Sequence, residues 1–174
     1  IGAVYQKNFQ LVAEFAEKSG IYIVNPLSER QQIITGHPRV FKVLPSLESQ
    51  FEHLAETLAR DYSNDKIFII RNSQYKDKDA TDRLRNACIK EQVKVQVTEG
   101  YSAAIGELSS EKENVLIAFT DNKVYAIEFL TKFNELRNDY KITVIGLPRW
   151  DKLEDLESDY LVNLKVHVIA PDFI

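Results

Sequence analysis

The sequence predicts an α/β protein built on doubly wound parallel sheets in three layers. Short runs of β-branched and other apolar residues alternate along the whole chain with amphipathic helical stretches. Turn-forming residues such as Gly20 and Asn25-Pro26 close these runs. The run at residues 115–119 is apolar throughout, as expected of a parallel strand that is covered on both faces. Right-handed crossovers then leave few topologies for the chain.

The first third of the chain begins with short strands and two helices. Strands are expected at residues 1–5, 21–24 and 39–43. Gly20 is expected to end the first helix and Ser46 to be the N-cap of the second. The apolar stripe of the first helix comprises Phe9, Val12, Ala13 and Ala16. The stripe of the second comprises Leu47, Phe51, Leu54, Ala55, Leu58 and Tyr62.

Four further helices alternate with five strands in the rest of the chain. The strands are expected at residues 66–70, 93–97, 115–119, 142–145 and 166–169. The helices are expected at about 77–91 and 102–108, after the Thr120-Asp121 cap, and from about residue 149. The stripes of the last two comprise Val124, Ile127, Leu130, Phe133 and Leu136, and then Trp150, Leu153, Leu156 and Tyr160.

Composition excludes several classes of protein. The chain has 174 residues, 22 basic and 26 acidic side chains and a net charge of -4, without a basic stripe, so a nucleic-acid partner is not expected. Its longest apolar runs are about five or six residues, whereas a membrane span needs about 20. The chain has no Met and begins at Ile1, so we expect a piece of a longer protein whose targeting segment lies upstream.

The sequence also lacks the motifs of common catalytic and cofactor sites. Its six glycines form neither G-x-G-x-x-G nor a P-loop, and no serine stands in a G-x-S-x-G elbow. The histidines are far apart, and the acidic run from Asp77 to Asp82 fits a helix start better than a calcium loop. Cys88 lies on an apolar stripe, which indicates packing rather than reactivity. We therefore expect no enzymatic activity, no metal and no cofactor.

Turn residues after the expected strands are a candidate binding rim. Ligands of open parallel sheets bind beyond the carboxyl ends of the strands. Here those positions are rich in Asn, Ser, Thr and Tyr, which could orient a small polar ligand and are also ordinary turn formers. The rim comprises residues 25–28, 72–75, 98–101, 120–122 and 147–150.

Four segments in succession resemble the type I periplasmic binding proteins, the family of amino-acid receptors and sugar-binding repressor domains. The segments are I-Y-I-V-N-P-L-S at 21–28, F-K-V-L-P-S at 41–46, K-I-F-I-I at 66–70 followed by Tyr75, and G-L-P-R-W at 146–150. Within the family, the chain is similar to amino-acid transporter substrate-binding proteins and to receptor-like domains that accompany peptidoglycan-binding LysM modules.

The resemblance implies two lobes. Residues 1–43 and 164–174 would form part of a first lobe whose beginning is missing, and residues 44–163 would form the second lobe. The chain would cross between two sheets near residues 43–46 and 163–165.

The resemblance also implies a function. The chain would be a non-catalytic module in the periplasm or cell envelope that binds an amino acid, a peptide or a cell-wall fragment between its lobes. Ser28 would contact the ligand from one side, Tyr75, Tyr101 and Asp121 from the other, and Trp150 could form a wall.

Two alternatives stay open from the sequence. Leu27 and Lys76 depart from the family pattern, which favours a structural or protein-interaction domain that keeps the fold without a ligand. A flavodoxin-like enzyme is the third reading, and the missing catalytic motifs argue against it. For Asp121, a role as helix N-cap competes with a role in binding.

Overall fold

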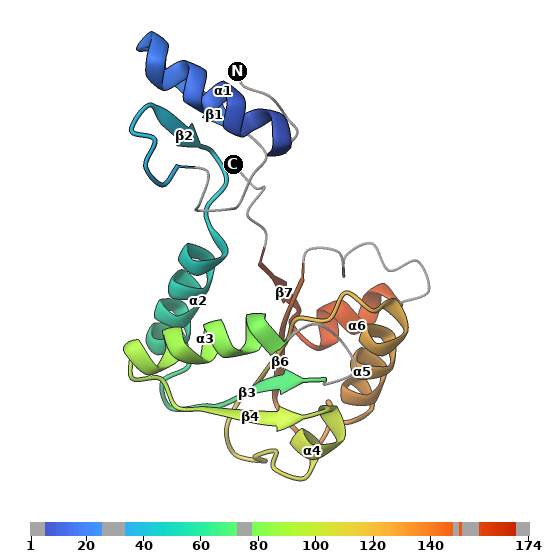
Figure 1. Ribbon diagram of the computed structural model, residues 1–174. Helices are drawn as coiled ribbons and strands as arrows, with labels where there is room; N and C mark the ends of the chain where they lie inside the picture. The colour runs from blue at the N-terminus through green and yellow to red at the C-terminus, as the bar shows by residue number, and fades with distance from the viewer. Residues whose placement is uncertain (1–5, 26–33, 73–77, 148–149, 151–156, 170–174) are drawn as a thin grey trace. The chain divides into compact units, whose positions relative to one another are not determined.

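The computed structural model describes residues 6–25, 34–72, 78–147, 150 and 157–169. The chain folds into two compact units, Ile1–Gln50 with Pro171–Ile174 and Phe51–Ala170. We call them unit 1 and unit 2 and describe each by itself. Figure 1 shows their helices and strands. The strand expected at residues 1–5 lies outside the described residues.

Unit 1 contains helix α1 and two strands, as the sequence predicted. The elements are α1 (Gln6–Ser19), β1 (Ile23–Asn25) and β2 (Val40–Lys42). Gly20 ends the helix with φ 70°, and the following amide of Ile21 donates to the carbonyl of Ala16 at 2.9 Å. Glycine adopts this left-handed conformation without the strain that a Cβ would add, which explains the stop.

The two strands of unit 1 run parallel, and α1 covers one face of their sheet. Ile23 lies opposite Val40, and Val24 lies opposite Phe41. Because side chains alternate along a strand, the first pair points to one face and the second pair to the other. The first pair is buried in the small core that α1 forms with Phe9, Ala13 and Ala16. Val24 and Phe41, in contrast, are 40% and 51% exposed.

Helix α2 (Leu47–Asp61) begins after the predicted N-cap. The hydroxyl oxygen of Ser46 accepts a hydrogen bond from the amide of Ser49 at 3.2 Å, which satisfies one of the free N–H groups of the first turn. Most of the predicted stripe is buried or partly buried in the core of unit 2, whereas Leu47 is 44% exposed.

Unit 2 contains a five-stranded parallel sheet in the order β4-β3-β5-β6-β7. Its strands are β3 (Lys66–Arg71), β4 (Val95–Glu99), β5 (Asn114–Ala118), β6 (Ile142–Gly146) and β7 (His167–Val168). The order reverses direction after β4, since the chain then returns past β3 to build β5, β6 and β7. This is the doubly wound parallel topology that the alternating pattern predicted.

Helices cover both faces of this sheet and make the three layers. Ile67 and Ile69 belong to the core on the side of α2 and α3 (Lys78–Lys90), where Cys88 is fully buried as predicted. Phe68 and Ile70 belong to the core on the side of α4 (Tyr101–Ile105) and α5 (Lys123–Glu135). None of the described helices is long and apolar enough to cross a bilayer.

Helix α5 buries a different stripe from the predicted one. Val124, which the prediction placed in the core, is 65% exposed, and Tyr125 is buried in its place. The helix turns its aromatic side inward because Phe rings remove more apolar surface from water than the valine would. The buried residues of the helix are Tyr125, Ala126, Phe129, Leu130, Phe133 and Asn134.

The last elements differ from the predicted boundaries. The helix expected from about residue 149 is described as α6 (Ser158–Asn163), and Leu153 and Leu156 of its predicted stripe lie outside the described residues. Strand β7 pairs with β6 in the sheet of unit 2, whereas residues 164–174 were assigned to the first lobe. The assignment of residues 164–174 to the first lobe stays a prediction. The identification of the two units with two lobes stays a prediction.

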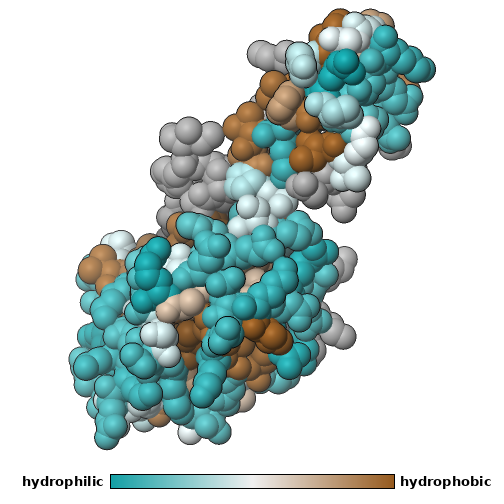
Figure 2. Space-filling model, turned by 90° about the vertical axis from the view of Figure 1, so that its left-hand side faces the viewer, coloured by the Kyte–Doolittle hydropathy of each residue, from teal (hydrophilic) through white to brown (hydrophobic). Residues whose placement is uncertain are grey.

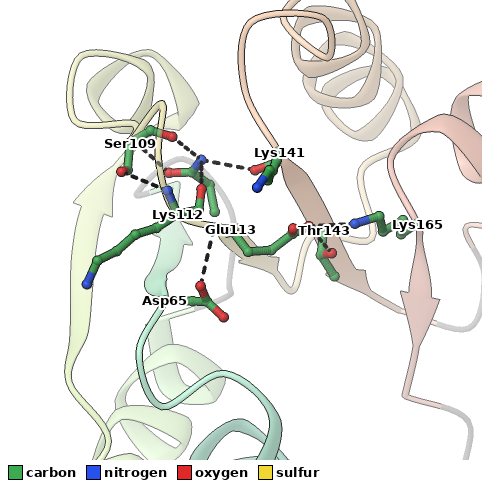
Figure 3. A network of polar contacts seen from close by, with 8 residues as sticks. Asp65, Ser109, Lys112, Glu113, Lys141, Thr143 and Lys165 are labelled. Carbon is green, nitrogen blue, oxygen red and sulfur yellow. Dashed lines mark hydrogen bonds and ion pairs between the residues drawn. The ribbon is translucent and has the colours of Figure 1, made fainter.

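A network of polar contacts joins the amino ends of the strands in unit 2 (Figure 3), and the buried Asn114 takes part in it. The side-chain oxygen of Asn114 accepts from the amide of Ser109 at 2.8 Å, and its nitrogen donates to the carbonyls of Ser109 and Lys141 at 2.9 and 3.0 Å. Asn114 is fully buried, so these bonds replace water for every polar atom of its side chain. The asparagine thus joins the loop before β5 to the start of β6.

Glu113 extends this network toward β7 (Figure 3). One carboxylate oxygen of Glu113 accepts from the hydroxyl of Thr143 at 2.7 Å and from the ammonium of Lys165 at 3.0 Å. Thr143 lies in β6 and Lys165 precedes β7, so the carboxylate links three neighbouring strands. The strands are therefore aligned at their amino ends.

Candidate functional site

The carboxyl ends of the parallel strands in unit 2 meet along one edge of the sheet. Strand β3 ends at Arg71, β4 at Glu99, β5 at Ala118 and β6 at Gly146. In open parallel sheets this edge is where ligands bind, because the loops that follow the strands converge there. We call it the carboxyl edge, and it is the candidate site.

An ion pair that the sequence analysis missed lies at this edge. Arg71 and Glu99 are register partners, and the guanidinium Nε donates to the carboxylate of Glu99 at 2.9 Å. The side chains are 32% and 48% exposed. The next amide, of Gly100, donates to the carbonyl of Arg71 at 2.6 Å, with Gly100 at φ 75°. The strands were predicted to end one and two residues earlier, which placed both charges in turns rather than opposite each other.

Asp121 follows the central strand β5 and is exposed. The prediction that Thr120-Asp121 caps helix α5 is wrong for Asp121. Asn122 is the N-cap, since its side-chain oxygen accepts from the amide of Tyr125 at 2.9 Å. The hydroxyl of Thr120 in turn accepts from the amide of Asn122 at 3.2 Å. Asp121 makes no hydrogen bond or ion pair with another residue that the structure describes, so its carboxylate is available to a ligand.

Tyr101 opens helix α4 and packs against α5. Its ring centroid is 5.5 Å from that of Tyr125, 6.3 Å from that of Phe129 and 6.5 Å from that of Phe133. The ring is half-buried and extends the aromatic core toward the surface. Tyr101 therefore supports the core from the β4 side of the carboxyl edge, and its contact with a ligand stays a prediction.

Trp150 is a core residue at the end of β6. It is 2% exposed, its ring centroid is 5.8 Å from that of Phe129, and its indole N–H donates to the carbonyl of Thr120 at 3.0 Å. A Cβ on Gly146 would lie 2.4 Å from the indole ring, so only glycine leaves room for it. Trp150 is thus a buried support for the loop carrying Asp121, and its contact with a ligand stays a prediction.

The structure describes only some of the predicted site residues. Ser28 and Tyr75 lie outside the described residues. Tyr101 and Trp150 both contact Phe129, so the structure brings them into one cluster. Asp121 lies next to this cluster in the chain, because its neighbour Thr120 accepts from the indole of Trp150 and its neighbour Asn122 accepts from the amide of Tyr125, which contacts Tyr101. The predicted placement of a ligand between two lobes stays a prediction.

The described residues also bear on the chemistry of the site. They contain no group of three His, Cys, Asp or Glu side chains that could hold a metal ion. Burial raises the pKa of the Cys88 thiol to about 11, which keeps it protonated and unreactive at neutral pH. The described residues of the carboxyl edge offer instead the Arg71–Glu99 ion pair and the exposed carboxylate of Asp121, which can bind polar groups of a solute.

Solved structures, solute-binding proteins of ABC transporters among them, have a similar fold. A substrate-binding protein of an ABC transporter from Desulfitobacterium hafniense matches with a TM-score of 0.55 and 13% identity, covering 87% of this chain and 46% of that one. A second protein from that organism, in complex with Leu, matches with a TM-score of 0.53, 12% identity and coverage of 94% and 55%. LpoA from Haemophilus influenzae matches with a TM-score of 0.55, 12% identity and coverage of 92% and 34%.

The chain spans about half the length of the ABC-transporter solute-binding proteins that it matches. No family model matches the chain, and a comparison with curated proteins finds no match. At these identities the likeness concerns the fold. The chain has an α/β fold with parallel sheets, which it shares with about half of a two-lobe type I periplasmic binding protein.

Proposed function

We propose that the chain is part of a solute-binding protein that holds a small polar ligand at the carboxyl edge of unit 2 without transforming it. The fold supports this proposal, because the similar structures are solute-binding proteins of transporters. The edge supports it as well, since its polar groups suit binding. The proposal includes a location in the periplasm or cell envelope and a kinship with receptor-like domains that accompany LysM modules.

The exposed carboxylate of Asp121 is the observation that carries the proposal. Helix α5 does not need it as a cap, because Asn122 has that role. A carboxylate only accepts hydrogen bonds, so Asp121 selects a donor such as an amine or a sugar hydroxyl. The Arg71–Glu99 pair ends the neighbouring strands and adds charges of both signs. Such an edge suits a zwitterion or a polyhydroxyl compound better than an apolar ligand.

The proposed ligand is an amino acid, a short peptide or a cell-wall fragment. One similar protein was solved with Leu, and another with 3,4-dihydroxybenzoic acid, which lacks an amine. Ser28, Tyr75 and Tyr101 are proposed to complete the site when two lobes close on the ligand. Binding energy would then shift an equilibrium between open and closed states.

Calorimetry on the longer protein that contains this chain tests the proposal. The probes are leucine, a leucine dipeptide, a muropeptide and 4-hydroxybenzoate. We expect binding of at least one amine-bearing or sugar probe, and about tenfold weaker binding by Asp121→Asn. The control is Asp139→Asn, which alters an exposed carboxylate before β6 at the opposite edge. Equal affinity of both variants would place the ligand elsewhere.

An interaction domain without a small ligand is the second candidate. The exposed apolar side chains of unit 1 favour it, because monomeric proteins rarely leave contiguous apolar patches in water. If none of the four probes binds, this candidate becomes the better one.

A further inference from the structure

The buried polar side chains of unit 2 differ between the two edges of its sheet. Hydrophilic side chains cover most of this unit in the lower part of the view in Figure 2, and a polar group that is buried instead needs a partner. At the amino ends of the strands, Asn114 and Thr143 bond to other residues of the chain. At the carboxyl edge, the hydroxyl of Thr98 is buried, and no described residue forms a hydrogen bond with it.

Thr98 points to the side of the sheet that carries α4 and α5. It is 6% exposed and pairs in register with Ile70, which belongs to the core on that side. Because side chains alternate along a strand, its neighbour Val97 points to the other side and packs with α2 and α3. The loop of Asp121 leads into α5, where Asn122 is the N-cap. Thr98 and Asp121 therefore belong to the same side of the carboxyl edge.

The position of Thr98 in a strand leaves its hydroxyl without a local partner. In a helix, a threonine can turn its hydroxyl to a carbonyl of the preceding turn. That option is open to Thr81 in α3, whose buried hydroxyl also has no bond to a described residue. In a strand, the carbonyls point sideways to the neighbouring strands. A hydrogen-bonding group from outside the chain would therefore recover free energy at Thr98 that folding leaves unused.

The turn after β4 leaves room for such a group. Gly100 follows two residues after Thr98 and has φ 75°. A Cβ built on Gly100 would meet no atom within 4 Å. The intervening side chain of Glu99 is 48% exposed. A ligand at the carboxyl edge can thus approach the end of β4 beside Thr98.

We propose that Thr98 hydrogen-bonds an uncharged amide group of the ligand, so that the edge selects a peptide or an acetamido sugar over a free amino acid. This inference rests on the proposed function of the carboxyl edge. A threonine hydroxyl both donates and accepts, and an amide group does the same. A charged group would lose its hydration at this buried position, whereas an amide loses less. The exposed Asp121 takes a donor group of the same ligand.

Calorimetry with Thr98→Val, in the longer protein that contains this chain, tests the assignment. Valine keeps the shape of threonine and removes its hydroxyl. The variant should bind a leucine dipeptide or N-acetylglucosamine about five- to tenfold more weakly and should bind leucine, which has no amide, as before. Thr98→Ser keeps the hydroxyl and should stay within about twofold of the unaltered protein. Thr81→Val is the matched control, since it removes a buried hydroxyl from α3 and should not change affinity.

Thermal unfolding without ligand separates binding from a structural role of the hydroxyl. Thr98→Val should unfold roughly 2–4 °C higher, because it no longer buries an unsatisfied group. A lower unfolding temperature would mean that the folded protein already satisfies the hydroxyl, and it would overturn the inference. Undiminished binding of the amide probes, or an equal loss for leucine, would overturn it as well. If Asp121→Asn still weakens binding then, the proposed function stands alone, and if no probe binds, both fail.

Discussion

Unit 1 and unit 2 both combine parallel strands with helices, but their helices cover the sheets to different extents. Among the residues that the structure describes, eleven large apolar residues are exposed, and eight of them lie in unit 1, which is less than a third of the chain. In unit 2, strands β5 and β6 are buried along their whole length, because helices lie on both sides. In unit 1, α1 covers one face and the other meets water. A parallel sheet therefore buries the side chains of both faces only where helices cover both, as in unit 2, whereas the sheet of unit 1 buries one face.

The largest expected effect separates a doubly covered sheet from a singly covered one. Phe129→Ala removes a fully buried ring that contacts Tyr101, Phe133 and Trp150, and should lower the free energy of unfolding by about 3–5 kcal/mol. Phe41→Ala, on the outer face of unit 1, should change it by less than about 0.5 kcal/mol. Urea unfolding followed by circular dichroism and by the fluorescence of Trp150, the one tryptophan, measures both. Similar losses for the two variants would contradict the comparison.

The next largest effect tests the close packing between the end of β6 and Trp150 in unit 2. Gly146→Ala would place a Cβ against the indole of Trp150 and should destabilise the chain by about 1–3 kcal/mol while shifting the tryptophan emission. Gly106→Ala is the control, because the nearest atom to its added Cβ is 4.0 Å away. An unchanged emission maximum in Gly146→Ala would mean that the strand end is not closed by the ring.

A smaller effect distinguishes Asn122, the N-cap of α5, from Asp121, the candidate ligand-binding residue. Asn122→Ala removes the side-chain oxygen that holds the amide of Tyr125 and should lower stability by about 1 kcal/mol. Asp121→Ala should leave stability nearly unchanged, since no described residue bonds to it. Thermal unfolding measures the stability of the two variants. If Asp121→Ala were the less stable one, Asp121 would be the N-cap.

The last effect concerns pH. The pKa of the Cys88 thiol is raised from 9.0 to about 11 by burial, so the folded chain keeps a proton that the unfolded chain loses. This contribution to stability is fully present below pH 9 and is lost as the pH rises toward 11. Unfolding measured at pH 8 and pH 10.5 should show a larger decrease for the native chain than for Cys88→Ala. Equal decreases would mean that the thiol is solvated.

The sequence predicted the elements whose boundaries depend on local chemistry. Gly20 and Ser46 end and begin helices through bonds within a few residues, and the apolar stripe around Cys88 is local as well. The α/β fold with parallel sheets followed from the alternation of these elements.

The incorrect or missed predictions concern features that depend on residues far away in the sequence. Asn122 rather than Asp121 caps α5 because the loop is fixed by Thr120, whose carbonyl holds the indole of Trp150 30 residues later. The Arg71–Glu99 pair depends on register between strands 28 residues apart. Neither relation has a spacing that can be recognised in one sequence, and the aromatic interior of α5 depends likewise on its neighbours.

Asn114 and Glu113 fix the amino ends of the strands through bonds that involve no residue of the carboxyl edge. Strand alignment and the candidate binding edge thus depend on different residues, at opposite ends of the strands. Substitutions in the loops after β3, β4 and β5 could accumulate, by selection or by design, without disturbing strand alignment. A fold of this kind can therefore acquire a new ligand repeatedly in evolution while its strand alignment stays the same.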